Sequence, residues 1–147
     1  QTMFAEYEMR SNAMVENGEN LTAENLCALY LELNKKYYGP DMVSDEEISY
    51  EWARIPHFYY NFYVYQYATS FSAAVAIAHE ILEKGAPAVE RYKEFLSGGC
   101  SKSPVELLKM VGINMEEATP IQNALDVFGE VLDEIESAKR IPDGSFG

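Results

Sequence analysis

Apolar residues recur along this chain at intervals of three and four positions, which is the spacing that builds one apolar face on a helix. In the first third of the chain this pattern predicts two helices, over residues 3–16 and 22–38. Thr22 is a suitable N-cap for the second helix, because its hydroxyl can accept a hydrogen bond from a free backbone N–H. Gly39 followed by Pro40 is a typical C-terminal stop.

A long helix is predicted to follow. Pro56 disfavours helical backbone at the residue before it, so the helix should begin at His57 or Phe58 and run to Lys84. About 27 residues at 1.5 Å each would make it roughly 40 Å long. Further helices are predicted to begin at Pro87, at Ser103-Pro104 and at Thr119-Pro120, the last reaching Lys139. No alternating run long enough for a strand is present, so we predict an all-α fold with a long central helix. Residues 1–140 would form one helical segment and 141–147 a tail.

Residues 57–71, HFYYNFYVYQYATSF, are unusually aromatic, with eight Phe or Tyr among fifteen. If the whole stretch is helical, one face carries Tyr60, Tyr63, Tyr67 and Phe71, with His57 one turn earlier. Such a stripe often packs a core, and that alternative stays open. Five tyrosines between positions 59 and 67 count against a purely apolar role, since every buried hydroxyl needs a hydrogen-bond partner.

Exposed tyrosine hydroxyls have a chemical use. A phenol is protonated at pH 7 and can donate a hydrogen bond to an oxygen that becomes negative, as in acyl transfer. His57 could donate to a substrate carbonyl in the same way. None of these groups activates water unaided. The stretch therefore indicates the assisting half of a site whose other groups lie elsewhere.

Charge and composition exclude several classes of function. The net charge of −13, from 24 acidic and 11 basic residues, leaves no basic patch for nucleic acid. No run of about 18 apolar residues predicts a membrane span. Cys27 and Cys100 form no CxxC motif, which favours a reduced, cytoplasmic protein, with a disulfide as the alternative. The chain begins without Met and already in a helical pattern, so we expect a piece of a longer protein.

One segment invites a zinc interpretation. His79-Glu80 begins the sequence HEILE, which resembles HExxH but has Glu83 where the second histidine would stand. One imidazole and two carboxylates could bind a metal, but an ordinary helix end is favoured. His57 is the only other histidine, so no self-contained zinc site is predicted.

Three segments resemble a known family: QTMFAEYE, RIPHFYYNFYVYQYATSFSAA and YKEFLSGGCSKSPVELLKMVGINM. They are similar to the C-terminal part of oligoendopeptidase F, in the thimet oligopeptidase group of zinc metallopeptidases. The resemblance extends from Gln1 to about Glu136. It implies a helical, largely closed peptidase with a deep channel for short peptides. The family's zinc is bound by an HExxH helix and a downstream Glu, which are absent here and expected upstream of Gln1.

The resemblance also implies roles for residues of the aromatic stretch. In the family a histidine, a Gly-rich loop and tyrosines contact the substrate and the tetrahedral intermediate. His57 matches that histidine, and Tyr60 and Tyr67 match two tyrosines seven positions apart. These three residues would be catalytic, and His57, Tyr60 and Tyr63 would bind substrate; no residue of the chain would bind the metal.

The sequence departs from the family pattern at two places. Phe58-Tyr59 replaces the Gly-rich loop, so loop flexibility is not carried over. The intermediate tyrosine falls at Val64, which leaves Tyr63 as its substitute.

The predicted function is therefore the substrate-facing segment of a zinc-dependent endopeptidase that hydrolyses oligopeptides. Its partners would be oligopeptide substrates and the upstream part of the same polypeptide. By itself the segment would be inactive, because it lacks the zinc ligands. The alternative is a non-catalytic helical module whose aromatic face binds a peptide or another ligand. A stable proteolytic remnant without activity of its own is also compatible with the first hypothesis.

Overall fold

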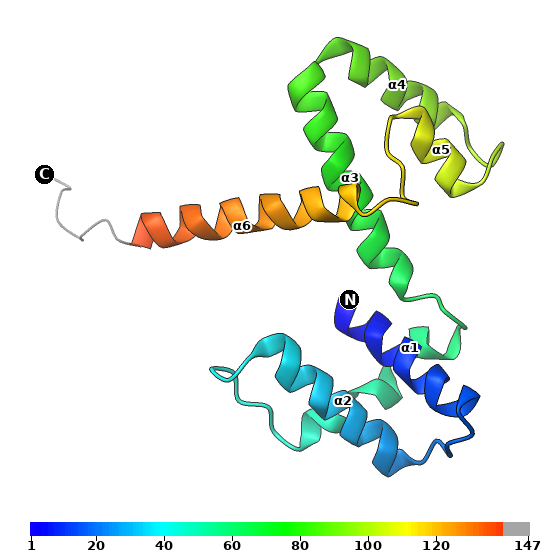
Figure 1. The fold of residues 1–147 in the computed structure, drawn as a ribbon, viewed down its shortest axis with the longest axis vertical. Coiled ribbons are helices and arrows are strands. Elements are labelled where there is room, and N and C mark those ends of the chain that lie inside the picture. The colour runs from blue at the N-terminus through cyan, green and yellow to red at the C-terminus, as the bar shows by residue number, and fades with distance from the viewer. Residues whose placement is uncertain (140–147) are drawn as a thin grey trace, which may run out of the picture. The chain divides into compact units, whose positions relative to one another are not determined.

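A computed structural model describes residues 1–139, and within them every regular element is helical (Figure 1). The elements are α1 (Thr2–Glu16), α2 (Ala23–Tyr38), the 3₁₀ helices η1 (Glu47–Arg54) and η2 (Pro56–Tyr59), α3 (Tyr65–Lys84), α4 (Ala86–Ser97), α5 (Pro104–Met110) and α6 (Thr119–Lys139). The all-α prediction is confirmed. The predicted tail, 141–147, lies outside the described residues.

The contacts of the chain fall into two compact units. The first is Gln1–Ala68 and the second begins at Thr69. Each unit has an apolar core of its own. The assignment of 1–140 to one helical segment stays a prediction.

The predicted helix ends are confirmed where their capping chemistry is local. The Thr22 hydroxyl accepts a hydrogen bond from Asn25 N at 3.2 Å, and Gly39 ends α2 with a φ of 77°. Ser103 and Glu106 form a reciprocal capping box at the start of α5. These signals are read correctly from sequence because each depends on only a few neighbouring residues.

The prediction of one long helix from His57 or Phe58 is wrong. Pro56–Tyr59 forms a separate 3₁₀ turn, Tyr60 is extended, and α3 begins only at Tyr65, with 20 residues. The interruption lies at Phe62, whose φ of 52° cannot be part of a right-handed helix. Tyr60, Tyr63, Tyr67 and Phe71 therefore do not share one helical face.

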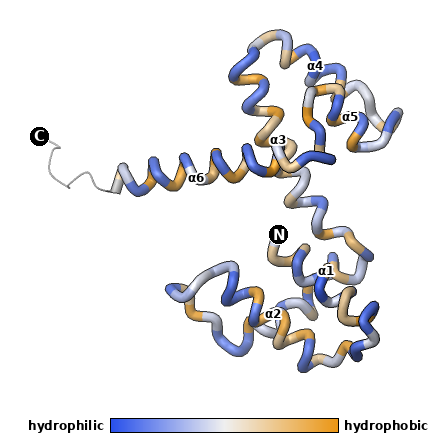
Figure 2. The backbone as a smooth tube through the Cα atoms, in the orientation of Figure 1, coloured by the Kyte–Doolittle hydropathy of each residue, from blue (hydrophilic) through white to orange (hydrophobic). Residues whose placement is uncertain are grey.

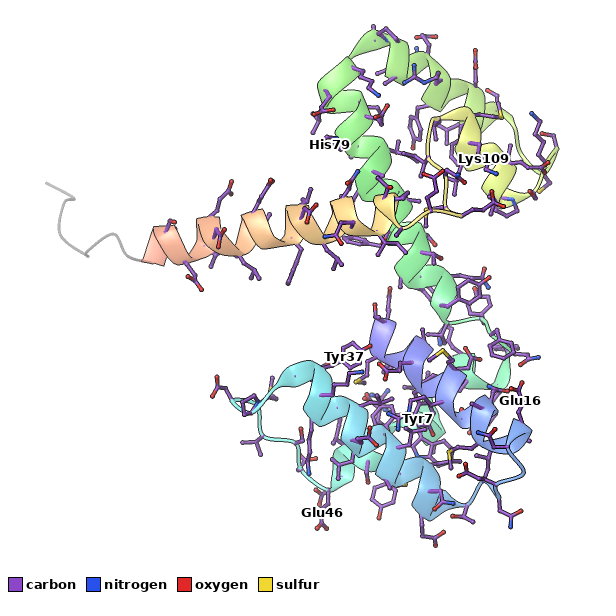
Figure 3. The ribbon with its side chains drawn as sticks, in the orientation of Figure 1. Tyr7, Glu16, Tyr37, Glu46, His79 and Lys109 are labelled. Atoms are coloured by element: carbon purple, nitrogen blue, oxygen red, sulfur yellow. The ribbon has the colours of Figure 1, made fainter. Side chains whose placement is uncertain are left out.

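The core of the first unit lies between α1, α2 and the 3₁₀ segments. Its members are Met3, Tyr7, Leu29, Tyr30 and Leu33, of which Tyr30 and Leu33 are completely buried. Tyr7 projects from α1 toward α2, and its ring lies 5.3 Å from that of Tyr30 (Figure 3). The Tyr30 hydroxyl donates to Glu51 Oε2 at 2.6 Å, which attaches η1 to α2. Burial and this bond raise the pKa of Tyr30, so the phenol stays protonated.

The core of the second unit is smaller. Ala76 and Ile77 of α3 pack with Val111 and Ile113, which follow α5. Helix α6 contributes little to it. Figure 2 shows apolar and polar positions alternating along this helix. Six of its large apolar residues are exposed, namely Ile121, Leu125, Phe128, Val131, Leu132 and Ile135.

Two tyrosines of the first core make a matched pair for a stability test. Tyr30→Phe should lower the free energy of unfolding by about 1.5–3 kcal/mol, because it removes a buried hydrogen bond to a carboxylate. Tyr7→Phe should not lower it, since the Tyr7 hydroxyl is buried with no partner among the described residues. Urea denaturation followed by circular dichroism measures both. Equal losses in the two variants would contradict the assignment.

Candidate functional site

The aromatic segment is fixed at its two ends by buried residues. Ile55 is extended and buried directly before Pro56, as the effect of proline on its predecessor predicts. Val64 is only 2% exposed directly before α3. Between them, Phe58 packs into the first core with its ring 4.9 Å from that of Tyr7. The segment between these anchors therefore forms a surface loop with a fixed start and end.

The middle of the loop is held by α1. Phe62 N donates a hydrogen bond to Glu8 Oε1 at 2.8 Å, and Glu8 is only 4% exposed. A second bond, from Tyr63 N to Tyr60 O at 3.0 Å, closes the turn around Phe62. Tyr60 and Tyr63 are thus placed by the backbone of a turn and not by helical periodicity.

Four candidate residues form a connected aromatic cluster, which comprises His57, Tyr60, Tyr63 and Tyr67. The His57 ring stacks on Tyr63 with centroids 5.7 Å apart, and it meets the edge of Tyr67 at 5.6 Å. Tyr63 also contacts Tyr67 at 5.7 Å and Tyr60 at 6.3 Å. Tyr63 therefore lies at the centre of the cluster, and Tyr60 joins it through Tyr63.

Hydrogen bonds join the polar ends of these rings. The Tyr67 hydroxyl lies 3.2 Å from His57 Nε2. A hydrogen bond with the Tyr63 hydroxyl, together with some desolvation, raises the pKa of Tyr67 above its ordinary value. Tyr67 therefore keeps its proton at neutral pH and can act as a donor. All three tyrosines of the cluster are exposed within the first unit, so a core-only role does not describe them.

Some sequence-based placements hold and others fail. His57, Tyr63 and Tyr67 come together, and Tyr60 contacts Tyr63. The sequence had grouped these four residues, although on a helical face that does not form. Phe71 is exposed, in the second unit. Sequence reasoning missed Glu8. It is one of 24 acidic residues, and nothing in its local sequence marks it as buried.

Two aromatic residues next to the cluster line a pocket instead. Phe62 and Tyr65 border a depression of about 430 Å³ together with Thr2, Ala5, Glu6, Glu8, Met9 and Tyr37. Its floor is the face of α1 that also carries Glu8. The loop thus has a hydroxyl-bearing cluster and an apolar pocket close to each other within one unit.

The described residues offer no set of metal ligands. No group of three or more His, Cys, Asp or Glu side chains comes together among residues 1–139. His79 Nε2 lies 3.5 Å from Glu83 Oε1 on α3, and Glu80 pairs with Lys84 and Arg91. Zinc does not fit these residues. None of the helices in this range is long and apolar enough to cross a bilayer.

The helical fold agrees with what the chain resembles. The model of peptidase family M3 matches residues 1–127, and the chain belongs to this family. It is 53% identical over 136 residues to oligopeptidase PepF of Bacillus subtilis (strain 168), an alignment that covers 92% of this chain and 20% of that protein. It is 43% identical over 136 residues to the chromosomal oligoendopeptidase F of Lactococcus lactis subsp. cremoris, covering 92% and 23%.

A solved structure agrees with these relatives. The crystal structure of oligoendopeptidase-F from Enterococcus faecium matches with a TM-score of 0.85 and 46% identity, covering 92% of this chain and 26% of that one. The predicted resemblance to oligoendopeptidase F is confirmed. The chain spans about a fifth to a quarter of the length of these relatives.

The protonation state of Tyr67 can be measured directly. Because its pKa is raised from 10.0, the neutral form should still predominate at pH 10. Subtracting the alkaline absorbance titration of Tyr67→Phe from that of the parent chain, at the tyrosinate band, should isolate a transition with its midpoint above pH 10. A midpoint below that value would show that the hydroxyl does not donate to Tyr63.

Proposed function

We propose that this chain is the substrate-facing part of a zinc-dependent endopeptidase that hydrolyses oligopeptides. The observation that carries the proposal is the exposed aromatic cluster, in which the Tyr67 hydroxyl lies 3.2 Å from His57 Nε2 and its ring contacts that of Tyr63. Membership of peptidase family M3 supports the reaction class. The names of the relatives, oligopeptidase and oligoendopeptidase, support short peptides as substrates.

In this proposal each residue of the cluster has a role. Tyr67 and Tyr60 donate hydrogen bonds to the scissile carbonyl oxygen as it becomes negative. Donors held close to the reacting carbonyl are effective there, and the bound substrate would replace the neighbouring ring as the acceptor of the Tyr67 proton. His57 orients the substrate backbone, and Tyr63 holds Tyr67 and His57 in position while also contacting the peptide.

The remaining aromatic residues divide between two tasks. Phe58 packs the core, as its contacts with Tyr7 and Phe4 indicate. Phe62 and Tyr65 line the neighbouring pocket of about 430 Å³, which we assign to an apolar side chain of the peptide.

The metal and the activation of water belong to residues outside this chain in the proposal, because the described residues provide no ligand set. The chain alone would then have no peptidase activity. Cys27 and Cys100 are both free, which supports a reduced, cytoplasmic location.

The upstream part of the same polypeptide is the proposed partner of α6. Within the second unit this helix exposes an apolar face that the other residues of that unit leave uncovered, and large exposed apolar patches usually mark interfaces. The relatives are four to five times as long as the matched region, so polypeptide that could cover it exists in them.

The catalytic role of Tyr67 is tested by removing one oxygen atom. In the longer polypeptide, Tyr67→Phe should lower kcat for a quenched fluorogenic oligopeptide by about 10²–10³-fold, with little change in KM, because it removes a donor to the developing oxyanion. The melting temperature should stay close to that of the parent. Tyr50→Phe, an exposed tyrosine of η1 outside the cluster, is the matched control and should keep full activity.

A fall in melting temperature with kcat intact would contradict the role of Tyr67. If the longer polypeptide cleaves no peptide, and the 147 residues alone bind peptide equally well with and without a chelator, the binding-module alternative replaces the peptidase.

The proposed cover of α6 is tested by placing a charge on its apolar face. Phe128→Glu should lower the free energy of unfolding of the longer polypeptide by about 3 kcal/mol or more, because it buries an unpaired carboxylate. In the 147 residues alone the same change should leave the stability nearly unaltered, since Phe128 is exposed there. Ser137→Glu, on the opposite face, should have little effect in either context. Equal effects of Phe128→Glu in both contexts would exclude the partner.

A further inference from the structure

Glu8 is a buried carboxyl group whose bonded partner lies far away in sequence. It stands on α1 next to the core residue Tyr7 and is 4% exposed, yet it takes no part in the salt bridges of that helix, which use Glu6 and Arg10. Its Oε1 accepts the Phe62 N–H at 2.8 Å, across 54 positions of chain. Burying a polar group without a hydrogen bond costs free energy, so the bond from the Phe62 N–H stabilises the Glu8 carboxyl in its buried position.

The backbone that Glu8 holds is strained. Phe62 has a φ of 52° and is the only residue other than glycine with a positive φ within residues 1–139. A bulky side chain adopts this left-handed conformation only where the surroundings impose it. The Phe62 ring is 45% exposed and only borders the pocket on α1, so it constrains the backbone less than a buried ring would. The bond from Tyr63 N to Tyr60 O closes the turn locally, and the bond from the Phe62 N–H to Glu8 joins the turn to a buried group of α1.

The direction of the chain after Phe62 decides where the hydroxyls lie. The turn places Tyr60 before it and Tyr63 after it, closed by the bond from Tyr63 N to Tyr60 O. Tyr63 then stacks on His57, and its ring lies 5.7 Å from that of Tyr67. An ordinary negative φ at Phe62 would redirect Tyr60 relative to Tyr63 and break this arrangement.

We propose that Glu8 is a positioning residue for the aromatic cluster, acting through the Phe62 N–H and not through the substrate. Its effect on catalysis rests on the peptidase function proposed above. Its effect on the geometry of the loop does not, because that effect involves only residues of the first unit.

Three variants separate positioning from general stability. Glu8→Leu removes the acceptor and fills its place with an apolar side chain, whereas Glu8→Gln keeps an acceptor oxygen. Glu8→Leu combined with Phe62→Gly tests rescue, because glycine adopts a positive φ without strain. The matched control is Asn34→Leu, which removes a buried acceptor of the Ser44 hydroxyl in α2, away from the loop.

The first readout is structural and uses the 147 residues. Glu8→Leu should accelerate amide hydrogen exchange at Phe62 and shift the NMR signals of the His57 ring, which the stacked Tyr63 ring perturbs. Glu8→Gln and Asn34→Leu should leave both close to the parent. Unchanged exchange at Phe62 in Glu8→Leu would overturn the inference, whatever the enzyme does.

The second readout is kinetic and uses the longer polypeptide. Glu8→Leu should lower kcat by about 10²-fold with a small change in KM, since a displaced catalytic group loses its alignment. Glu8→Gln should recover most of the rate, and the double variant should recover kcat while KM rises, because Phe62 lines the proposed side-chain pocket. On a Tyr67→Phe background the Glu8→Leu effect should shrink, because both changes disable the same group.

The two hypotheses fail in different ways. If Tyr67→Phe leaves kcat unchanged, the assigned function of the cluster fails, while the exchange and NMR results still decide the role of Glu8. If Tyr67→Phe lowers kcat but Glu8→Leu behaves like Asn34→Leu, with reduced stability and unchanged kcat, the positioning role fails alone.

Discussion

The hydrogen bond between the Glu8 carboxyl and the Phe62 N–H is the contact on which the functional surface depends. It joins the first helix to the middle of the loop by a hydrogen bond, and it stabilises a left-handed turn at an aromatic residue. The turn separates the 3₁₀ helix η2 from α3, which begins only at Tyr65. The exposure of the tyrosines is a consequence, since a continuous helix would orient them by its own periodicity.

The loop divides its aromatic residues between burial and solvent. Phe58, which has no hydroxyl, enters the core against Tyr7, while Tyr60, Tyr63 and Tyr67 remain exposed and touch one another. Hydroxyls on an exposed surface can reach a ligand without leaving a core. The position at which the family pattern places a further tyrosine is Val64, which is fully buried and anchors the loop. Tyr63 occupies the centre of the cluster in its place.

The two units differ in how completely their own residues cover them. The first unit buries Tyr30 and Leu33 completely and joins η1 to α2 through Glu51. The second leaves most of the apolar face of α6 exposed, over about four turns of helix whose apolar residues recur with the period of a core helix. The pattern of α6 therefore indicates a neighbour that the other residues of the second unit do not provide.

The sequence determined by itself every feature that depends on short-range chemistry. The Thr22 cap, the Gly39 stop, the capping box at Ser103 and the all-α fold follow from residues within a few positions of one another. The resemblance to oligoendopeptidase F also came from local motifs. The tertiary structure alone decided that residues 60–64 leave the helix, because the Phe62 N–H bonds to a residue 54 positions earlier. Helical periodicity carries no information about a contact between residues so far apart. The residues of the cluster could therefore be named from the sequence, but their arrangement could not be predicted.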